Sequence, residues 1–171
     1  WLATQPAAPA AAEGSDAAAA SQFPERLQLD ISRVATLRYG ENPHQQAAVY
    51  EDGKARQRGT LLTARQLNGK ELSYNNLLDL DSALAIVRGW AQPAVSVIKH
   101  NNPCGAAAAD DLATAARNAL DGDPVSAFGS VLAFNRPVDA AAAEVLAVPG
   151  RFIEAIAAPS FTAEALEILT T

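Results

Sequence analysis

Apolar and polar residues follow two different periods along the chain, and the two kinds of segment succeed one another. Short apolar or alternating runs bounded by glycine or proline predict strands. Apolar residues three and four positions apart predict amphipathic helices. These patterns predict strands at residues 27–31, 46–51, 94–98, 131–134 and 152–158, and helices at residues 76–91, 111–120, 139–146 and 162–170. This succession indicates a layered α/β fold with crossover helices.

The first 22 residues differ from the remainder of the chain. They are rich in alanine, with scattered proline, glycine and serine, and they lack periodic leucine, isoleucine or valine to bury. Such a segment is typical of a linker, so we expect residues 1–22 to connect two domains and residues 23–171 to fold. The chain begins with Trp1 and contains no methionine, so we expect it to be a piece of a longer protein.

Composition limits the classes of partner. The net charge of −6 argues against broad nucleic-acid binding, which needs a basic surface. The apolar runs are shorter than a membrane span requires. The single cysteine, Cys104, excludes an intrachain disulfide and fits a reducing, cytoplasmic setting. We therefore expect a cytoplasmic protein that binds neither nucleic acid nor a membrane.

The segment K-H-N-N-P-C-G at residues 99–105 directly follows the predicted buried strand 94–98. Its proline and glycine are poor ladder residues, which predicts that the chain turns there. Ligands commonly bind just beyond the carboxyl ends of strands. A cation, Lys99, beside a residue that titrates near neutral pH, His100, can form an acid–base pair. The alternative is that both side chains merely cap an exposed loop.

Two further polar segments carry chemical groups that a core does not need. The segment L-R-Y-G-E-N-P-H-Q at residues 37–45 offers a guanidinium group, a phenol and an imidazole. The segment D-P-V-S-A-F-G at residues 123–129 ends in a glycine, which permits close backbone approach to a flat ligand or a tight turn. Ordinary polar turns are the alternative for both segments.

A metal site has little support. The pair Pro103-Cys104 resembles the start of the P-C-x-x-C zinc motif of nucleobase deaminases, but Ala107 stands where the second cysteine would be. His44, His100 and Cys104 could supply three ligands, yet they lack zinc-site spacing. We expect no zinc or other metal, and we interpret the cysteine as a small packed residue rather than a nucleophile.

Taken in order, the polar segments resemble the successive signatures of a known family. They are similar to the bifunctional purine biosynthesis proteins, which combine AICAR formyltransferase with IMP cyclohydrolase. The matching segments are residues 37–45, 67–76, 99–105, 123–129 and 152–159. The resemblance implies a cytidine-deaminase-like, three-layer α/β fold in an incomplete chain, with residues 23–171 forming the N-terminal lobe of the formyltransferase domain.

The resemblance also implies a reaction and its residues. A formyl group would pass from the co-substrate 10-formyltetrahydrofolate to the amine of AICAR, giving FAICAR, while ring closure to IMP belongs to another domain. Lys99 and His100 match the catalytic pair of the family. The expected substrate-binding residues are Arg38, Tyr39, Asn101, Gly129 and Glu154. The full-length protein would be a homodimer. The alternative is an inactive fragment or nucleotide-binding module that lacks the second lobe.

Overall fold

The computed structural model describes residues 25–52 and 60–170 and contains two separate sheets. The first sheet is a hairpin formed by β1 (Ile31–Thr36) and β2 (Ala48–Asp52). The second has the strand order β4-β3-β5-β6, from β3 (Ala94–Lys99), β4 (Asn102–Ala108), β5 (Ser130–Phe134) and β6 (Ile153–Ala157). The helices are η1 (Leu61–Thr63), α1 (Tyr74–Arg88), α2 (Leu112–Asp121), α3 (Ala140–Leu146) and α4 (Ala163–Leu169).

The four-stranded sheet is mixed, and its strand directions bring three strand termini to one end. Strand β3 is antiparallel to both β4 and β5, whereas β6 is parallel to β5. Ile98 pairs with Val131, and Ser130 pairs with Ile153. The carboxyl end of β3 therefore lies beside the starts of β5 and β6, and we call this end of the sheet the site end.

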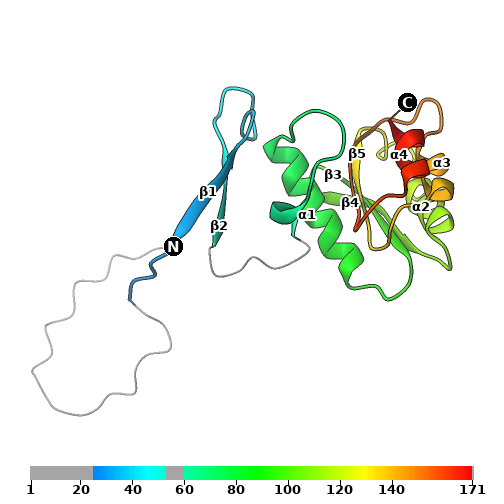
Figure 1. The fold of residues 1–171 in the computed structure, drawn as a ribbon, viewed down its shortest axis with the longest axis horizontal. Helices are drawn as coiled ribbons and strands as arrows, with labels where there is room; N and C mark the ends of the chain where they lie inside the picture. Colours follow the sequence, from blue (N-terminus) through cyan, green and yellow to red (C-terminus); the bar gives the residue numbers. More distant parts are fainter. Residues whose placement is uncertain (1–24, 53–59, 171) are drawn as a thin grey trace, which may run out of the picture.

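Helices cover both faces of this sheet, which gives three layers (Figure 1). Helix α1 packs on one face, where it contacts β3, β5 and β6, while α2 packs on the other face beside α3, and α4 packs against α3. All residues of β5, and all residues of β3 except Lys99, are buried. Burial on both faces explains why these central strands read as continuous apolar runs.

Two hydrophobic clusters lie on opposite faces of the sheet. The larger cluster, between the sheet and α2 and α3, includes Leu132 and Phe134, and the smaller cluster, beneath α1, includes Val87 and Ile98. Figure 1 shows the hairpin standing to one side of these layers. From here on, residues 31–52 are called the hairpin and residues 73–170 the α/β body.

The α/β class predicted from the sequence is confirmed. The predicted strands at 94–98, 131–134 and 152–158, and all four predicted helices, occur within a few residues of their expected bounds. The cytidine-deaminase-like assignment stays a prediction. The predicted linker at residues 1–22 lies outside the described residues.

The first predicted strand was placed wrongly. The alternation at residues 27–31 predicted a half-buried strand, but β1 begins only at Ile31. Leu27 and Leu29 are 78% and 71% exposed. Alternation alone cannot create a strand where no neighbouring strand or core covers the apolar face.

The segment after Lys99 also differs from the prediction, because it returns as strand β4 after a turn of two residues. Pro103 is tolerated because β4 is an edge strand and the pairing register shifts here, with Val97 opposite Gly105 and Ile98 opposite Pro103. Gly105 is required by packing, since a Cβ atom there would lie 1.8 Å from the carbonyl oxygen of Ala119 in α2. Pro103 therefore marks an edge strand, and Gly105 marks a close contact with α2. Neither residue ends the strand.

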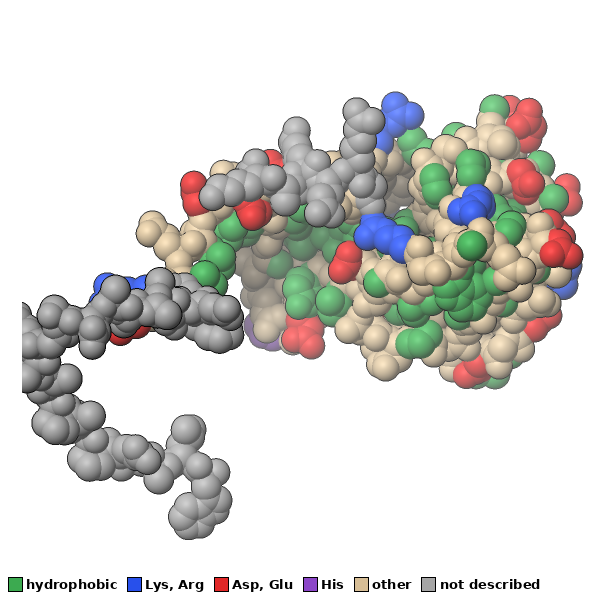
Figure 2. Space-filling model, turned by 90° about the horizontal axis from the view of Figure 1, so that it is seen from below, with side chains coloured by type: hydrophobic (Ala, Val, Ile, Leu, Met, Phe, Trp, Pro, Cys, Tyr) green, Lys and Arg blue, Asp and Glu red, His purple; other side chains and the backbone are tan. Residues whose placement is uncertain are grey.

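The described part of the chain contains no helix that is long and apolar enough to cross a membrane. In the space-filling view, acidic side chains are scattered over the visible face of the α/β body, and the basic side chains there are isolated from one another (Figure 2). Hydrophobic side chains are visible on both the hairpin and the α/β body. The lack of nucleic-acid binding stays a prediction from the net charge.

Candidate functional site

Lys99 ends β3 at the site end, where its side chain is fixed by the loop that precedes β5. The ammonium group donates a hydrogen bond to the carbonyl oxygen of Phe128 at 2.7 Å. An ammonium group has three donors, so two remain for a ligand. The side chain is half-buried, which holds a cation at the sheet end without removing it from solvent.

Asp123 in the same loop adds a negative charge close to Lys99. The hydroxyl of Ser126 donates to Asp123 Oδ2 at 2.6 Å, and the Ser126 amide donates to Oδ1 at 3.0 Å. These hydrogen bonds, with a smaller contribution from the charge of Lys99, lower the pKa of Asp123. The loop before β5 therefore places a carboxylate with a lowered pKa near the ammonium group of Lys99.

His100 and Asn101 form the two-residue turn between β3 and β4, so His100 lies at the tip of this strand pair. Both residues have left-handed backbone conformations, with φ of 55° and 59°. A two-residue turn with positive φ at both positions matches the right-handed twist of antiparallel strands. His100 is exposed at this tip. The imidazole is therefore accessible to a ligand at the site end.

Gly129 is the last residue of the loop that precedes β5, and its φ is 71°. Its amide donates to the carbonyl oxygen of Phe152 at 2.7 Å, which ties the start of β5 to the residue before β6. The rings of Phe128 and Phe152 are 5.7 Å apart between centroids and tilted by 51°. Both rings are at least half exposed, so they offer an aromatic surface beside the site end.

Glu154 in β6 is held by the amino-terminal part of α1. Asn76 Nδ2 donates to Glu154 Oε2 at 2.8 Å. Asn76 also completes a capping box with Ser73, the residue before α1, which fixes the start of this helix. The acidic group predicted from the sequence is therefore anchored at the same end of the sheet as Lys99.

Arg38 and Tyr39 reach this region from the loop of the hairpin. The Arg38 guanidinium lies 4.8 Å from the centroid of the Tyr39 ring, and its Nη2 atom donates to the phenolic oxygen at 3.2 Å. That hydrogen bond and the nearby Ser73 hydroxyl lower the pKa of Tyr39, while the charge of Glu154 opposes the effect. Ser73 and Glu154 belong to the α/β body, so Tyr39 lies near the start of α1 and near β6.

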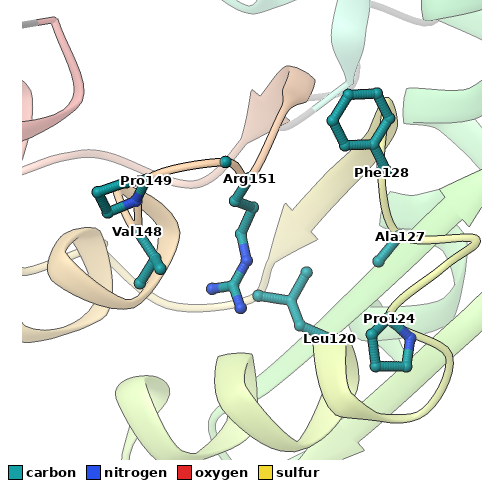
Figure 3. Close-up of a pocket in the computed structure, with 8 residues that line it drawn as sticks. Leu120, Pro124, Ala127, Phe128, Val148, Pro149 and Arg151 are labelled. Atoms are coloured by element: carbon teal, nitrogen blue, oxygen red, sulfur yellow. The ribbon is translucent and has the colours of Figure 1, made fainter.

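Two cavities border this region without containing the lysine–histidine pair. The larger, about 470 Å³, lies where the loop of the hairpin meets Tyr74. The other, about 230 Å³, lies beyond Phe128, between the end of α2 and the loop before β6 (Figure 3). Figure 3 shows the Arg151 side chain extending into the latter space, and one of its nitrogens donates to the carbonyl oxygen of Val145. Neither Lys99 nor His100 is among the residues that line these two cavities.

The structure does not assemble the three candidate zinc ligands. No group of three histidine, cysteine, aspartate or glutamate side chains within residues 25–52 and 60–170 could hold a metal ion. Cys104 donates from its sulfur to the carbonyl oxygen of Val97 at 3.5 Å, and burial raises the pKa of its thiol. A protonated thiol is neither a metal ligand nor a nucleophile.

The sequence reasoning missed the residues that support the site. A helix that starts at residue 76, as the sequence predicts, would have Asp79 in its first turn, but α1 begins at Tyr74 and has no acid in its first turn. Instead, Asp79 Oδ1 accepts the backbone amide of Asn101 at 2.7 Å. The signal that could have placed the start of α1 is Ser73 followed three residues later by Asn76, whose side chain accepts a hydrogen bond from the Ser73 amide.

Known proteins match this chain over most of its length. The family model described as "AICARFT/IMPCHase bienzyme" matches residues 8–171. A relative from Rhodopirellula baltica is 59% identical over 154 residues, covering 90% of this chain and 29% of the relative. A relative from Oceanobacillus iheyensis is 51% identical over 149 residues, covering 87% of this chain and 29% of the relative.

A third relative, from Sorangium cellulosum, is 51% identical over 162 residues, covering 93% of this chain and 30% of the relative. All three carry the name "Bifunctional purine biosynthesis protein PurH". The chain therefore spans less than a third of the length of the curated relatives it matches.

Proposed function

Because the chain belongs to the AICARFT/IMPCHase bienzyme family, we propose that it is the first lobe of an AICAR formyltransferase within a bifunctional purine biosynthesis protein. Residues 23–171 form this lobe, and residues 1–22 link it to a cyclohydrolase domain. The lobe contributes to the transfer of a formyl group from 10-formyltetrahydrofolate to AICAR, giving FAICAR.

The observation that carries this proposal is the convergence of the predicted residues at the site end. Lys99 and Gly129 flank the junction of β3 and β5, and Glu154 lies one residue into β6. Tyr39 lies near them, because Ser73 and Glu154 both influence the pKa of its phenol. Segments separated by more than a hundred residues of sequence thus supply one surface with a cation, an imidazole, a carboxylate and a phenol.

The reaction needs a base for the amine proton and a positive charge that stabilises the developing oxyanion. His100 can supply the base, and Lys99 the positive charge. The amine of AICAR is a weak nucleophile because its lone pair is conjugated with the imidazole carboxamide. As the amine nitrogen attacks the formyl carbon, His100 accepts the amine proton. Lys99 faces the oxyanion that develops on the formyl oxygen. The bond from the formyl carbon to N10 of the folate then breaks, and N10 takes up a proton, which regenerates tetrahydrofolate.

The remaining residues bind the nucleotide in this proposal. Arg38 presents a fork of donors suited to a phosphate or a carboxamide oxygen. Tyr39 and Glu154 orient polar groups of the base or the ribose, and the backbone at Gly129 approaches the ring closely. Asn101 contributes from the turn beside His100.

The wider assembly is part of the proposal. A second lobe and a second subunit of a homodimer complete the site, the bifunctional protein is cytoplasmic, and ring closure to IMP occurs in the domain before residue 1. The coverage of less than a third of each relative supports the requirement for additional domains.

The test uses a hybrid protein in which this chain replaces the matching segment of the full-length Rhodopirellula baltica relative. The two sequences are 59% identical over 154 residues, so the surrounding domains should accept the replacement. We expect the hybrid to formylate AICAR with 10-formyltetrahydrofolate, and to cyclise FAICAR. A folded hybrid that retains ring closure but shows no formyl transfer would contradict the proposal and favour a nucleotide-binding or inactive lobe.

A further inference from the structure

The turn that carries His100 adopts a backbone conformation that is uncommon for residues other than glycine. His100 and Asn101 have φ of 55° and 59°, in the left-handed region where a Cβ atom crowds the following carbonyl oxygen. Asparagine tolerates this region better than histidine does. Two consecutive residues of this kind persist only when surrounding contacts hold them.

Those contacts come from one side of α1. Asp79 Oδ1 accepts the backbone amide of Asn101 at 2.7 Å, and the Ser82 hydroxyl donates to the Asn101 side-chain oxygen. Asp79 and Ser82 are three residues apart on the helix, so both side chains reach the same turn. On the turn itself, Asn102 Nδ2 donates to the His100 carbonyl oxygen at 2.9 Å.

Helix α1 is itself well fixed to the sheet, so it can hold the turn rigidly. The hydroxyl of Ser96, in the middle of β3, donates to the carbonyl oxygen of Ala83 at 2.8 Å, and both residues are fully buried. Ala83 directly follows Ser82. The strand that ends in Lys99 and the helix that holds the turn are therefore joined by a buried hydrogen bond one turn of helix from Asp79.

We propose that Asp79, assisted by Ser82, is a positioning residue that holds the His100–Asn101 turn and thereby keeps the imidazole of His100 where the reaction needs it. This inference rests on the proposed function, in which His100 is the general base. Asp79 acts through the backbone of Asn101 and does not touch the substrate. A base must lie within hydrogen-bond reach of the proton it takes, so a small shift of the turn removes its effect.

The contact predicts which property of Asp79 matters. The carboxylate oxygen serves as an acceptor for a backbone amide, and an asparagine carbonyl can accept the same hydrogen bond, although more weakly than a charged group. An alanine cannot accept it. The role of Asp79 therefore depends more on its hydrogen-bond acceptor than on its negative charge. Direct stabilisation of a protonated imidazole would instead require the charge.

The test measures formyl transfer by variants of the hybrid protein. We expect Asp79→Ala to lower kcat by about 10²-fold, the loss associated with a misplacement of about 1 Å, with little change in KM for AICAR. Asp79→Asn should recover most of that loss, and Ser82→Ala should lower kcat less than Asp79→Ala. Asp81→Ala is the matched control, because Asp81 is an exposed acid two residues further along the same helix.

Several outcomes would overturn the inference. If Asp79→Ala kept kcat, or if Asp79→Asn lost as much activity as Asp79→Ala, the hydrogen bond to the turn would not be the cause. If Asp79→Ala failed to fold, Ser82→Ala would decide: a folded variant with an unchanged melting temperature and unchanged kcat would contradict the role, and a selective loss of kcat would support it.

A crystal structure of the Asp79→Ala or Ser82→Ala hybrid separates this inference from the proposed function. We expect His100 and Asn101 to leave the left-handed region or to lose order. If the unmodified hybrid transferred no formyl group, the proposed function would fail, and the structure would still report on the turn. An unchanged turn in the variant would refute the positioning role whatever the activity of the unmodified hybrid.

Discussion

The hairpin and the α/β body both bring residues to the site end, but they are stabilised very differently. Strands β3 and β5 of the body are buried, whereas every residue of β1 is exposed. A two-stranded hairpin alone is marginally stable in water, while a sheet covered by helices on both faces is not. A hydrogen bond of 3.2 Å from Asn75 Nδ2 to the carbonyl oxygen of Glu41 links the two regions.

This difference suggests a division of labour. The α/β body carries Lys99 and His100 at the end of a rigid strand, where a reacting group must hold its position. The hairpin carries Arg38 and Tyr39, which we propose bind the nucleotide. We therefore expect substitutions in the body to lower kcat or stability, and substitutions in the hairpin to raise KM.

The largest effect should follow loss of the proposed catalytic pair, Lys99 and His100, in the hybrid protein. We expect His100→Ala to lower kcat for formyl transfer by about 10²–10⁴-fold, the usual contribution of a general base. Lys99→Ala should lower it by about 10²–10³-fold, as for one electrostatic donor. Ring closure to IMP should continue in both variants, and separate assays of the two reactions would show this.

His44→Ala provides the control within the hairpin, since it removes the other histidine of the chain. We expect it mainly to raise KM. If His44→Ala abolished turnover while His100→Ala left kcat near normal, the assignment of the base and the division between the two regions would both be wrong.

The next largest effect concerns stability of the α/β body. Phe134 in β5 is 1% exposed and is among the largest fully buried side chains. Truncation to alanine leaves a cavity, so Phe134→Ala should lower the free energy of unfolding by about 3–5 kcal/mol. Urea denaturation, monitored by the far-ultraviolet circular dichroism of the helices, would measure this change in the free energy of unfolding. A loss below about 1 kcal/mol would indicate that the core relaxes around the cavity or that the residue is not packed as described.

A smaller effect is expected for Arg38 in the hairpin. Arg38→Ala removes the proposed charged donor to the ligand and the hydrogen bond that helps lower the pKa of Tyr39. A hydrogen bond to a charged group contributes about 1.5–3 kcal/mol, so KM for AICAR should rise by about 10–100-fold while kcat changes little. A fall in kcat at constant KM would place Arg38 in the chemical step and break the division.

The smallest effect is expected for Val34→Ala on β1. Val34 is 42% exposed, so the change should alter the free energy of unfolding by less than about 0.5 kcal/mol in the same denaturation experiment. A loss comparable to that of Phe134→Ala would show that the hairpin is an integral part of the core.

The sequence predicted the central strands well because burial on both faces produces continuous apolar runs, as at residues 94–98 and 131–134. It misplaced the first strand of the hairpin, because the alternation at Leu27 and Leu29 lies before that strand rather than in it, whereas β2 occurs close to the strand predicted at residues 46–51. It also missed β4, because Pro103 and Gly105 read as breakers when the true constraints are an edge position and the nearby Ala119 carbonyl oxygen.

The candidate site was also predictable only in part. Lys99 and His100 stand out as polar residues directly after a buried strand, whereas Asp79 and Asn76 are ordinary polar residues on a helix. Their contacts with Asn101 and Glu154 depend on how α1 crosses the sheet, which no local pattern encodes. The residues that hold a site are set by tertiary packing, and the sequence alone does not distinguish them from solvated ones.

The most direct measurement is a crystal structure of the hybrid protein with AICAR bound. The account predicts that the nucleotide lies across the site end, with its amine nitrogen about 2.6–3.2 Å from an imidazole nitrogen of His100, and with Lys99 on the side from which the formyl oxygen approaches. A structure in which AICAR binds elsewhere, or in which another side chain contacts the amine while His100 points away, would contradict the account.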